Sequence, residues 1–257
     1  MCAKVLVTDF DGVICDSVSE CLLAAENAWG ELQTSYKTEK TLDLSSIRAE
    51  RQRRFRELRP YLRGAEDFIP LLIAVERDLE VESQTDFDLL RRRLQHQLPR
   101  FQQAFYTERD FLRREHHELW LQLNPLFSEV GRALAARKEV GPAPFAHIHI
   151  LTTKRQADVE DILEYHGINF PPEQIHSVKS DGKMSRLQGI LQTEASTPAD
   201  TVYIEDQIDY LLSAAPAGID VQLARWGYVS EEQLHSAELN GIAVIEQADM
   251  AALLEWF

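Results

Sequence analysis

Features of secreted and membrane proteins are scarce in this 257-residue sequence. Its only three cysteines, Cys2, Cys15 and Cys21, lie near the amino end without the spacing of a zinc site or a disulfide framework. No apolar run is long enough to span a bilayer, and no signal region precedes the first expected strand. These absences predict a protein of the reducing cytoplasm, with no membrane partner.

Basic residues are also in short supply. The chain has 27 Lys and Arg against 42 Asp and Glu, which gives a formal net charge of −15. A negative surplus of this size opposes nonspecific binding to nucleic acid and to anionic membranes. We therefore expect no nucleic-acid partner. With 44% hydrophobic residues, the chain can still bury a full core in one large or two modest domains.

The periodicity of apolar residues divides the chain into two kinds of sequence. From residue 17 to residue 124 they recur at three- and four-residue spacing, which predicts helices over residues 17–33, 45–58, 65–79 and 86–123. Beyond that point short apolar runs alternate with helical patterns, and the predicted strands are Ile148–Thr152, Ile175–Val178, Val202–Glu205 and Val221–Ala224. Such alternation predicts an α/β fold with a parallel sheet covered by helices.

The amino-terminal run Lys4–Thr8 is typical of a further strand buried on both faces. The simplest architecture adds it to the later sheet, so that residues 1–16 and 125–257 form an α/β core domain and residues 17–124 form an inserted all-helical domain. The insert has 17 basic and 19 acidic residues, a net charge of −2, which leaves −13 for the core. The acidic surplus is thus expected on the sheet domain.

Two carboxylates, Asp9 and Asp11, follow this first strand one residue apart. Ligands of open α/β sheets lie beyond the carboxyl ends of the strands, so both side chains can reach that crevice. Two anions so close repel each other unless a cation or a shared proton relieves the charge, which indicates a divalent-metal site. Alone, the pair would be equally typical of a turn or a helix cap.

Three further strand ends carry polar groups. Thr152, Thr153 and Lys154 follow one strand, where hydroxyls, a cation and a helix start suit a phosphoryl group, although a helix cap would look the same. Lys183 follows the next strand at the expected start of a helix, and a surface lysine is its competing interpretation. Two adjacent acids, Glu205 and Asp206, lie at the end of the third strand, where their oxygens could coordinate Mg²⁺.

Together these motifs resemble those of the haloacid dehalogenase superfamily, in the branch with a helical cap inserted after the first strand. Asp9-Phe-Asp11-Gly-Val is similar to the first motif, Thr152 to the second, Lys183 to the third, and Glu205-Asp206 with the following Ala214–Gly218 segment to the fourth. The resemblance implies a Rossmann-like, doubly wound core. Phosphoglycolate phosphatases are the nearest named subgroup, although the cap carries no motif for glycolate.

The resemblance also implies roles for these residues. Asp9 would be the nucleophile that forms an aspartyl-phosphate, and Asp11 would be the general acid and base. Mg²⁺ would be held by Asp9, the backbone carbonyl of Asp11, Glu205 and Asp206. Thr152 and Lys183 would stabilise the transferred phosphoryl group. An acid at Asp11 favours phosphoryl transfer over dehalogenation in this family.

Arginine-rich pieces of the insert alternate with acids, which is typical of a solvated, ion-paired helix face. The best candidates in the insert for substrate contact are Arg59 and Arg63, which lie near Pro60 and Gly64 at an expected loop or helix junction. In the core, the candidates for substrate contact are Thr153 and Lys154.

The leading hypothesis is therefore a Mg²⁺-dependent phosphatase of a small phosphorylated metabolite, acting as a monomer or homodimer. A sugar phosphomutase would share Asp9, Asp11, Glu205 and Asp206. A non-catalytic binding or regulatory protein could keep the same fold. The sequence leaves the substrate, the pathway and the role of Asp209 open.

Overall fold

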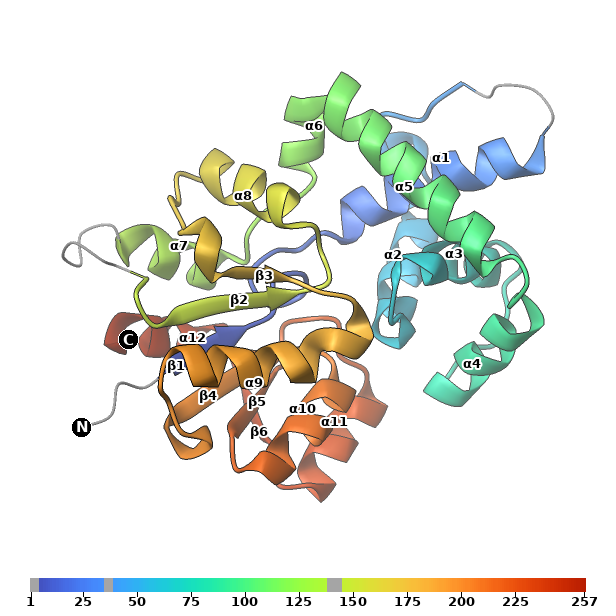
Figure 1. Ribbon diagram of the computed structural model, residues 1–257. Helices are drawn as coiled ribbons and strands as arrows, with labels where there is room; N and C mark the ends of the chain where they lie inside the picture. Colours follow the sequence, from blue (N-terminus) through green and yellow to red (C-terminus); the bar gives the residue numbers. More distant parts are fainter. Residues whose placement is uncertain (1–4, 35–38, 138–144) are drawn as a thin grey trace. The chain divides into compact units, whose positions relative to one another are not determined.

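The computed structural model describes residues 5–34, 39–137 and 145–257, and the chain divides into two compact units (Figure 1). One unit comprises Met1–Asp16 and Pro125–Phe257, and the other Ser17–Asn124. Cys2 and Lys4, which figured in the sequence interpretation, lie outside the described residues. Among the described helices, none is both long and apolar enough to cross a membrane.

A six-stranded sheet in the order β3-β2-β1-β4-β5-β6 forms the centre of the first unit, and all its neighbouring strands are parallel. The strands are β1 Val5–Thr8, β2 Ile148–Thr152, β3 Ile175–Ser177, β4 Thr201–Glu205, β5 Asp220–Ala224 and β6 Ala243–Ile245. The predicted α/β class with a parallel, doubly wound sheet is confirmed. The order reverses at β1, and such a switch point is where ligands bind in open α/β sheets.

Helices cover both faces of this sheet. On one face α9 Lys183–Thr193, α10 Ile208–Ala214 and α11 Glu231–Leu239 pack in a core cluster with side chains of β1, β2, β4 and β5. Figure 1 shows α7 Ser128–Ala136 and α8 Gln156–Tyr165 on the other side, and α12 Gln247–Trp256 packs against α7. β1 lies in the middle of the sheet and is fully buried, which explains its uninterrupted apolar run.

Differences from the predicted strands are confined to ends and edges. β3 stops at Ser177, one residue early, while β4 and β5 each begin one residue early, at Thr201 and Asp220. The edge strand β6 was not predicted from the sequence. It has three residues, of which Ala243 and Val244 are exposed, so it lacks the buried apolar run that marks the inner strands.

The second unit contains helices only among its described residues. They are α1 Val18–Gln33, α2 Ala49–Leu58, α3 Phe68–Glu76, α4 Gln84–Arg93, α5 Leu98–Glu115 and α6 His117–Gln122, with short 3-10 turns between some of them. Stacked aromatic rings form part of its core, since the Phe68 and Phe105 ring centroids are 4.5 Å apart. Burial of such rings contributes both area and favourable ring contacts.

The predicted continuous helix over residues 86–123 was wrong. The chain leaves α-helical geometry after Arg93. Pro99 lies in the first turn of α5, where the lack of a backbone N–H removes no helical hydrogen bond. His116, with φ −135° and ψ 48°, then separates α5 from α6. Apolar spacing persisted through both breaks because all three helices bury one face, so periodicity alone did not reveal them.

Two other helices start later than the periodicity indicated. The α-helix within residues 45–58 begins only at Ala49, after a 3-10 turn at Leu44–Ser46. The one within residues 65–79 begins at Phe68 and ends at Glu76, and Asp78 adopts a left-handed φ of 50°. A residue with left-handed backbone geometry cannot continue an α-helix, and many helices end just before one.

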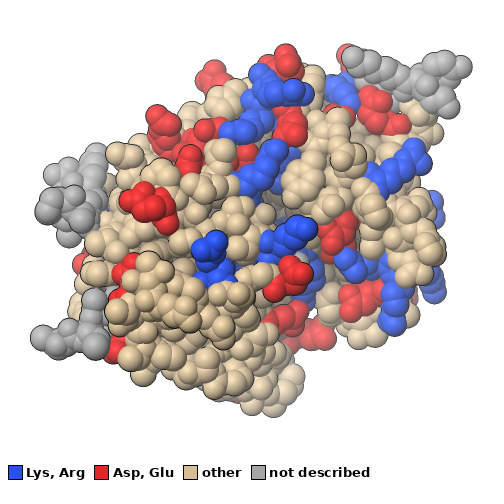
Figure 2. All heavy atoms as spheres, in the orientation of Figure 1, with Lys and Arg blue, Asp and Glu red and all other residues tan. Residues whose placement is uncertain are grey.

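Several arginines of the helical unit are ion-paired. Arg53 contacts Glu50 and Glu57, while Arg91 contacts Glu66 and Asp67. On the face seen in Figure 2, Lys and Arg are interspersed with Asp and Glu. This arrangement agrees with the interpretation of the arginine-rich pieces as a solvated, ion-paired surface.

Candidate active site

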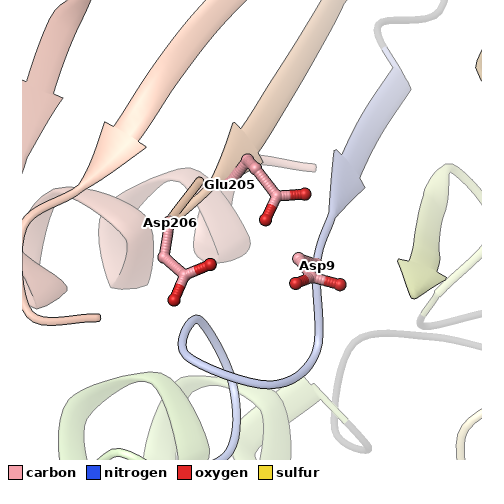
Figure 3. Close-up of side chains that lie close together, drawn as sticks. All are labelled: Asp9, Glu205 and Asp206. Atoms are coloured by element: carbon pink, nitrogen blue, oxygen red, sulfur yellow. The ribbon is translucent and has the colours of Figure 1, made fainter. Parts of the chain in front are cut away.

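The carboxyl ends of β1 and β4, on either side of the switch point, bring three acids together. The register pairs Thr8 with Ile204, and the Asp9 N–H donates to the Ile204 carbonyl at 3.0 Å, so Asp9 lies beside Glu205. One carboxylate oxygen from each of Asp9, Glu205 and Asp206 lies within 4.8 Å of the others (Figure 3). All three residues are buried. The Asp11 carboxylate is not part of this group.

Lys183, the first residue of α9, supplies a positive charge to this cluster. Its Nζ lies 3.1 Å from Asp9 Oδ1 and 2.7 Å from Glu205 Oε2, and it also lies over the Tyr210 ring at 4.4 Å. The side chain is only 3% exposed, so it acts within the buried cluster rather than on the surface. The competing interpretation of Lys183 as a surface lysine was wrong.

Burial and mutual repulsion perturb the acids strongly. Burial, followed by the charges of Glu205 and Asp11, raises the pKa of Asp9 to about 8, although Lys183 opposes the rise. Burial likewise raises the pKa of Glu205, against the effects of Lys183 and of the Tyr203 hydroxyl, which donates to Glu205 Oε2 at 2.8 Å. Burial alone would lower the pKa of Lys183, but Asp9 and Glu205 outweigh it and hold the ammonium charged.

The cluster fits a hard divalent cation. Within the described part of the chain, Asp9 Oδ1 and Glu205 Oε1 are buried without a well-aligned hydrogen bond. Buried carboxylate oxygens ordinarily have such partners or coordinate a metal. One ammonium cannot neutralise three carboxylates, whereas a dication bound by their oxygens would. Oxygen atoms from a few carboxylates are the ligand set that Mg²⁺ prefers in proteins.

Asp206 is positioned by two glycines that the sequence interpretation did not single out. Gly12 has φ +88°, and a Cβ there would lie 2.0 Å from Asp206 Oδ2. A Cβ on Gly227 would lie 2.4 Å from the Gly12 carbonyl oxygen. Only glycine allows these two turns to approach the carboxylate so closely. Asp206 Oδ2 also accepts a hydrogen bond from the Tyr228 N–H at 2.9 Å.

The segment after β5 makes hydrogen bonds to the loop that follows β1. The Trp226 indole Nε1 donates to the Val13 carbonyl at 3.0 Å, and the Tyr228 hydroxyl donates to Asp16 Oδ1 at 3.0 Å. The run Arg225-Trp-Gly-Tyr228 was visible in the sequence, but its partners lie more than 200 residues away along the chain. Only the parallel sheet, which aligns the ends of β1 and β5, brings them together.

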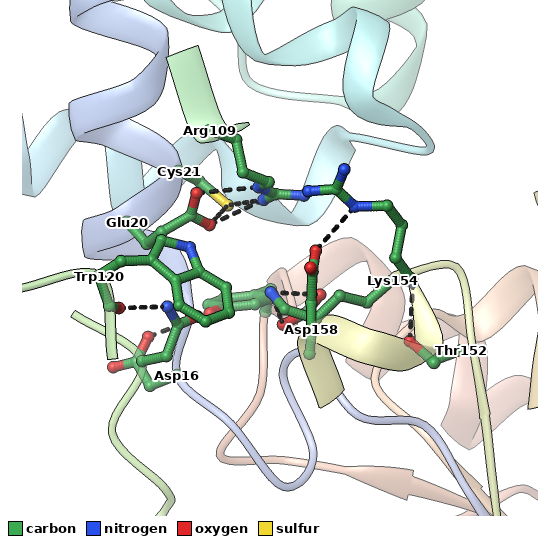
Figure 4. Close-up of polar contacts among 12 residues, drawn as sticks. Asp16, Glu20, Cys21, Arg109, Trp120, Thr152, Lys154 and Asp158 are labelled. Carbon is green, nitrogen blue, oxygen red and sulfur yellow. Dashed lines mark hydrogen bonds and ion pairs between the residues drawn. The ribbon is translucent and has the colours of Figure 1, made fainter. Parts of the chain in front are cut away.

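Asp11 and the residues after β2 form a second group. Lys154 Nζ lies 3.1 Å from Asp11 Oδ1. The Lys154 N–H donates to Thr152 Oγ1 at 3.1 Å, and Figure 4 shows these two residues. The Lys154 side chain is fully buried, while Asp11 keeps 17% exposure and Thr153 is exposed. Lys154 therefore contacts the predicted acid and base directly. Its contact with substrate, like that of Thr153, stays a prediction.

Arg59 and Arg63 belong to the helical unit. The Arg59 guanidinium lies over the Phe68 ring at 5.3 Å, and Arg63 Nη1 donates to the carbonyls of Pro60 and Leu62 at 2.9 and 3.1 Å. Both side chains thus take part in the packing and hydrogen bonding of their own unit. Their role in substrate binding stays a prediction.

No family model matches the sequence, and no curated protein matches it either. Several solved structures do match it. A predicted phosphoglycolate phosphatase from Haemophilus somnus is 15% identical, with a TM-score of 0.61 and coverage of 98% of both chains. A haloacid dehalogenase-like hydrolase from Streptococcus pneumoniae is 16% identical, with a TM-score of 0.59 and the same coverage.

A third structure is a haloacid dehalogenase family hydrolase from Deinococcus radiodurans with bound phosphate and sodium. It is 15% identical, with a TM-score of 0.55, and the match covers 99% of this chain and 96% of that one. The chain has the haloacid dehalogenase fold. At these identities the likeness establishes the fold over nearly the whole chain.

Proposed function

We propose that this protein is a Mg²⁺-dependent phosphatase that hydrolyses a small phosphomonoester through an aspartyl-phosphate on Asp9. The observation that carries the proposal is the buried group of Asp9, Glu205 and Asp206 with Lys183 in contact. Three acids and one lysine at a switch point can bind a cation together with the anionic group of a substrate. Phosphate bound to the structural neighbour from Deinococcus radiodurans supports that substrate class.

Asp9 is the nucleophile in this proposal. Its carboxylate would attack phosphorus, the P–O bond to the leaving group would break, and water would later hydrolyse the aspartyl-phosphate. The attacking oxygen must be ionised, which the raised pKa of about 8 opposes in the metal-free protein. Lys183, 3.1 Å away, lowers that pKa and so favours the ionised form.

Asp11 is the proton carrier. It would protonate the leaving alkoxide and then remove a proton from the attacking water, and its 17% exposure leaves it open to both. Lys154, 3.1 Å from Asp11 Oδ1, restricts where that carboxyl group can point. The Thr152 hydroxyl and the Lys183 ammonium would donate to the phosphoryl oxygens during transfer.

Asp9, the Asp11 carbonyl, Glu205 and Asp206 would hold Mg²⁺. When bound, the ion supplies positive charge to the site and to the phosphoryl oxygens. Tyr228 and the two close glycines keep Asp206 in place for this task. We also propose the cytoplasm as the place of action, with a small phosphorylated metabolite as substrate and a monomer or homodimer as the active form.

The test is release of inorganic phosphate from phosphoglycolate, sugar phosphates and nucleotides, with Mg²⁺ and with chelator. Wild type, Asp9→Asn and the control Asp209→Asn, an exposed acid outside the cluster, are compared. Release that needs both Mg²⁺ and Asp9 but not Asp209 supports the proposal. Phosphate release that survives in purified Asp9→Asn contradicts it. Transfer between hydroxyls of a sugar phosphate, without phosphate release, would replace it with a phosphomutase.

A further inference from the structure

Tyr203 is a polar side chain in the middle of the sheet. It lies at the centre of β4, where the strand register pairs it with Val7 of β1 and Val221 of β5. Side chains alternate along a strand, so Tyr203 and Glu205 point to the same face. Tyr203 is only 1% exposed and packs in the core cluster with side chains of α9 and α10. A hydroxyl in such apolar surroundings is costly to bury unless it makes a hydrogen bond.

The carboxylate of Glu205 is the hydrogen-bond partner of this hydroxyl. The Tyr203 hydroxyl donates to Glu205 Oε2 at 2.8 Å, and Lys183 Nζ donates to the same oxygen at 2.7 Å. An ionised carboxylate has about four lone-pair sites, two on each oxygen. The two donors therefore fill the sites of Oε2. Glu205 Oε1 is buried and, within the described residues, makes no well-aligned hydrogen bond, so it is the oxygen left for a cation.

A second acid of the cluster also has one oxygen held by the protein. Asp206 Oδ2 accepts a hydrogen bond from the Tyr228 N–H at 2.9 Å. A carboxylate with one oxygen held in this way is disposed to offer a cation its other oxygen rather than both. The donor to Asp206 belongs to the backbone, whereas the donor from Tyr203 is a hydroxyl that one substitution removes. The hydrogen bond to Glu205 is therefore the one whose effect on a bound cation can be measured.

The number of oxygens that a carboxylate offers separates Mg²⁺ from Ca²⁺. Mg²⁺ is the smaller ion and requires nearly octahedral ligands at about 2.0–2.1 Å. Ca²⁺ takes roughly six to eight oxygens at about 2.3–2.6 Å and often binds both oxygens of one carboxylate. A glutamate whose Oε2 already accepts two hydrogen bonds suits the smaller ion, because it offers one well-placed oxygen. The same hydrogen bonds oppose the two-oxygen coordination that the larger ion favours.

We propose that Tyr203 determines the metal specificity of the acidic cluster, because its hydrogen bond restricts Glu205 to coordination through Oε1 and so favours Mg²⁺ over Ca²⁺. The inference rests on the metal site of the proposed function. Tyr203 is a positioning residue, since its hydroxyl acts through Glu205 and not on the ion itself. Without the hydroxyl, Lys183 alone holds Oε2, and one lone-pair site of that oxygen becomes available to a larger cation.

The experiment measures the binding of Mg²⁺ and of Ca²⁺ by titration calorimetry in the absence of substrate. Wild type is compared with Tyr203→Phe, which keeps the buried ring and removes only the hydroxyl. The matched control is Tyr61→Phe, because Tyr61 is also buried and its hydroxyl donates to the Glu82 carbonyl at 2.9 Å in the helical unit. Circular dichroism and melting temperature check that each variant is folded. Tyr203→Phe is also made in a Glu205→Gln background, where it has no carboxylate to restrict.

We expect Tyr203→Phe to weaken Mg²⁺ binding by roughly tenfold, as the loss of a hydrogen bond to a metal ligand typically does. Ca²⁺ binding should be retained, so the ratio of the two affinities should fall by a similar factor. The control Tyr61→Phe should keep the wild-type ratio, and the ratio in the Glu205→Gln background should not respond to Tyr203→Phe.

An unchanged ratio in Tyr203→Phe, or equal weakening of both ions, would overturn the inference, because Tyr203 would then only fill the core. A shift of the ratio that persists in the Glu205→Gln background would overturn it as well, since the hydroxyl would not act through Glu205. Absence of Mg²⁺ binding in wild type would overturn both this inference and the Mg²⁺ dependence of the proposed function. The expected shift without phosphate release from any ester would support the inference and contradict the phosphatase alone.

Discussion

Each unit of this protein buries a cluster of ionisable side chains, and the two clusters differ in how many acids face each basic group. In the helical unit, Arg109 Nε and Nη2 donate to the two oxygens of Glu20 at 2.9 and 2.8 Å (Figure 4). In the sheet unit, Asp9, Glu205 and Asp206 lie close together, and the Lys183 ammonium contacts Asp9 and Glu205.

The balanced pair is satisfied by itself. One carboxylate meets one guanidinium in a bidentate geometry, which is the strongest arrangement for such a pair, and Cys21 Sγ lies 3.3 Å from Arg109 Nη2. Within the described residues, Asp9 Oδ1 and Glu205 Oε1 of the acidic cluster accept no well-aligned hydrogen bond, although the Lys183 ammonium lies 3.1 Å from Asp9 Oδ1. The buried charges thus pair with each other in one unit, whereas the surplus of acid in the other provides oxygen ligands for a cation.

The largest expected effect is on catalysis. Asp9→Asn removes the proposed nucleophile, so turnover should fall by about 10⁴-fold or more. Because the substitution also removes one of three mutually repelling acids, the metal-free melting temperature should stay the same or rise. Phosphate release and thermal unfolding check the two effects. A large loss of stability would mean that Asp9 is needed by the fold, which would break the contrast with Glu20.

Breaking the balanced pair should cost stability instead. Arg109→Met leaves Glu20 buried without an opposite charge, and the free energy of unfolding should fall by about 3–5 kcal/mol. The double variant Glu20→Leu with Arg109→Met removes both charges and should recover much of that loss. Urea unfolding gives both values. If Arg109→Met costs less than about 1 kcal/mol, the pair is not the structural element that we describe.

Mg²⁺ should stabilise the unbalanced cluster in a pH-dependent way. At one hundred times its dissociation constant it should add about 2.7 kcal/mol to the free energy of unfolding. The native protein holds the Asp9 proton up to about pH 8, whereas an ordinary Asp releases it near 3.8. Metal-free stability should therefore fall as pH rises through that window.

Bound Mg²⁺ favours the ionised Asp9, so its binding should release a proton at neutral pH and should strengthen as pH rises. Calorimetry in buffers of different ionisation enthalpy measures that proton. Asp206→Asn should weaken the binding and Asp209→Asn should not. Mg²⁺ affinity that is independent of pH between 6 and 8 would contradict the raised pKa of Asp9, by the linkage of proton and metal binding.

The smallest effect concerns Lys154. If it positions Asp11, Lys154→Met should lower kcat by roughly tenfold with little change in KM, because general acid–base catalysis depends on a placed carboxyl group. Lys154→Arg should retain more activity, and Lys179→Met, at an exposed lysine, should have no effect. A rise in KM with unchanged kcat would instead support the predicted substrate contact of Lys154.

The sequence made the inner strands predictable because they are buried on both faces. β1 therefore appears as an uninterrupted apolar run and β2 as a run broken only by His149, and the acids at the ends of β1 and β4 stand out against such runs. Helix breaks were less visible. The chain turns at His116 within a region whose apolar spacing continues, since the helices on both sides bury one face in the same unit.

What the sequence by itself determined was the alternation of strands and helices and the residue types at each strand end, because both follow from local periodicity and chain order. Tertiary structure alone decided which of these groups meet. The register of β1 with β4 places Asp9 beside Glu205, Tyr228 reaches Asp206 across a long separation, and Glu194 meets His147 and His149. Such contacts depend on strand order and side-chain direction, which no local pattern encodes.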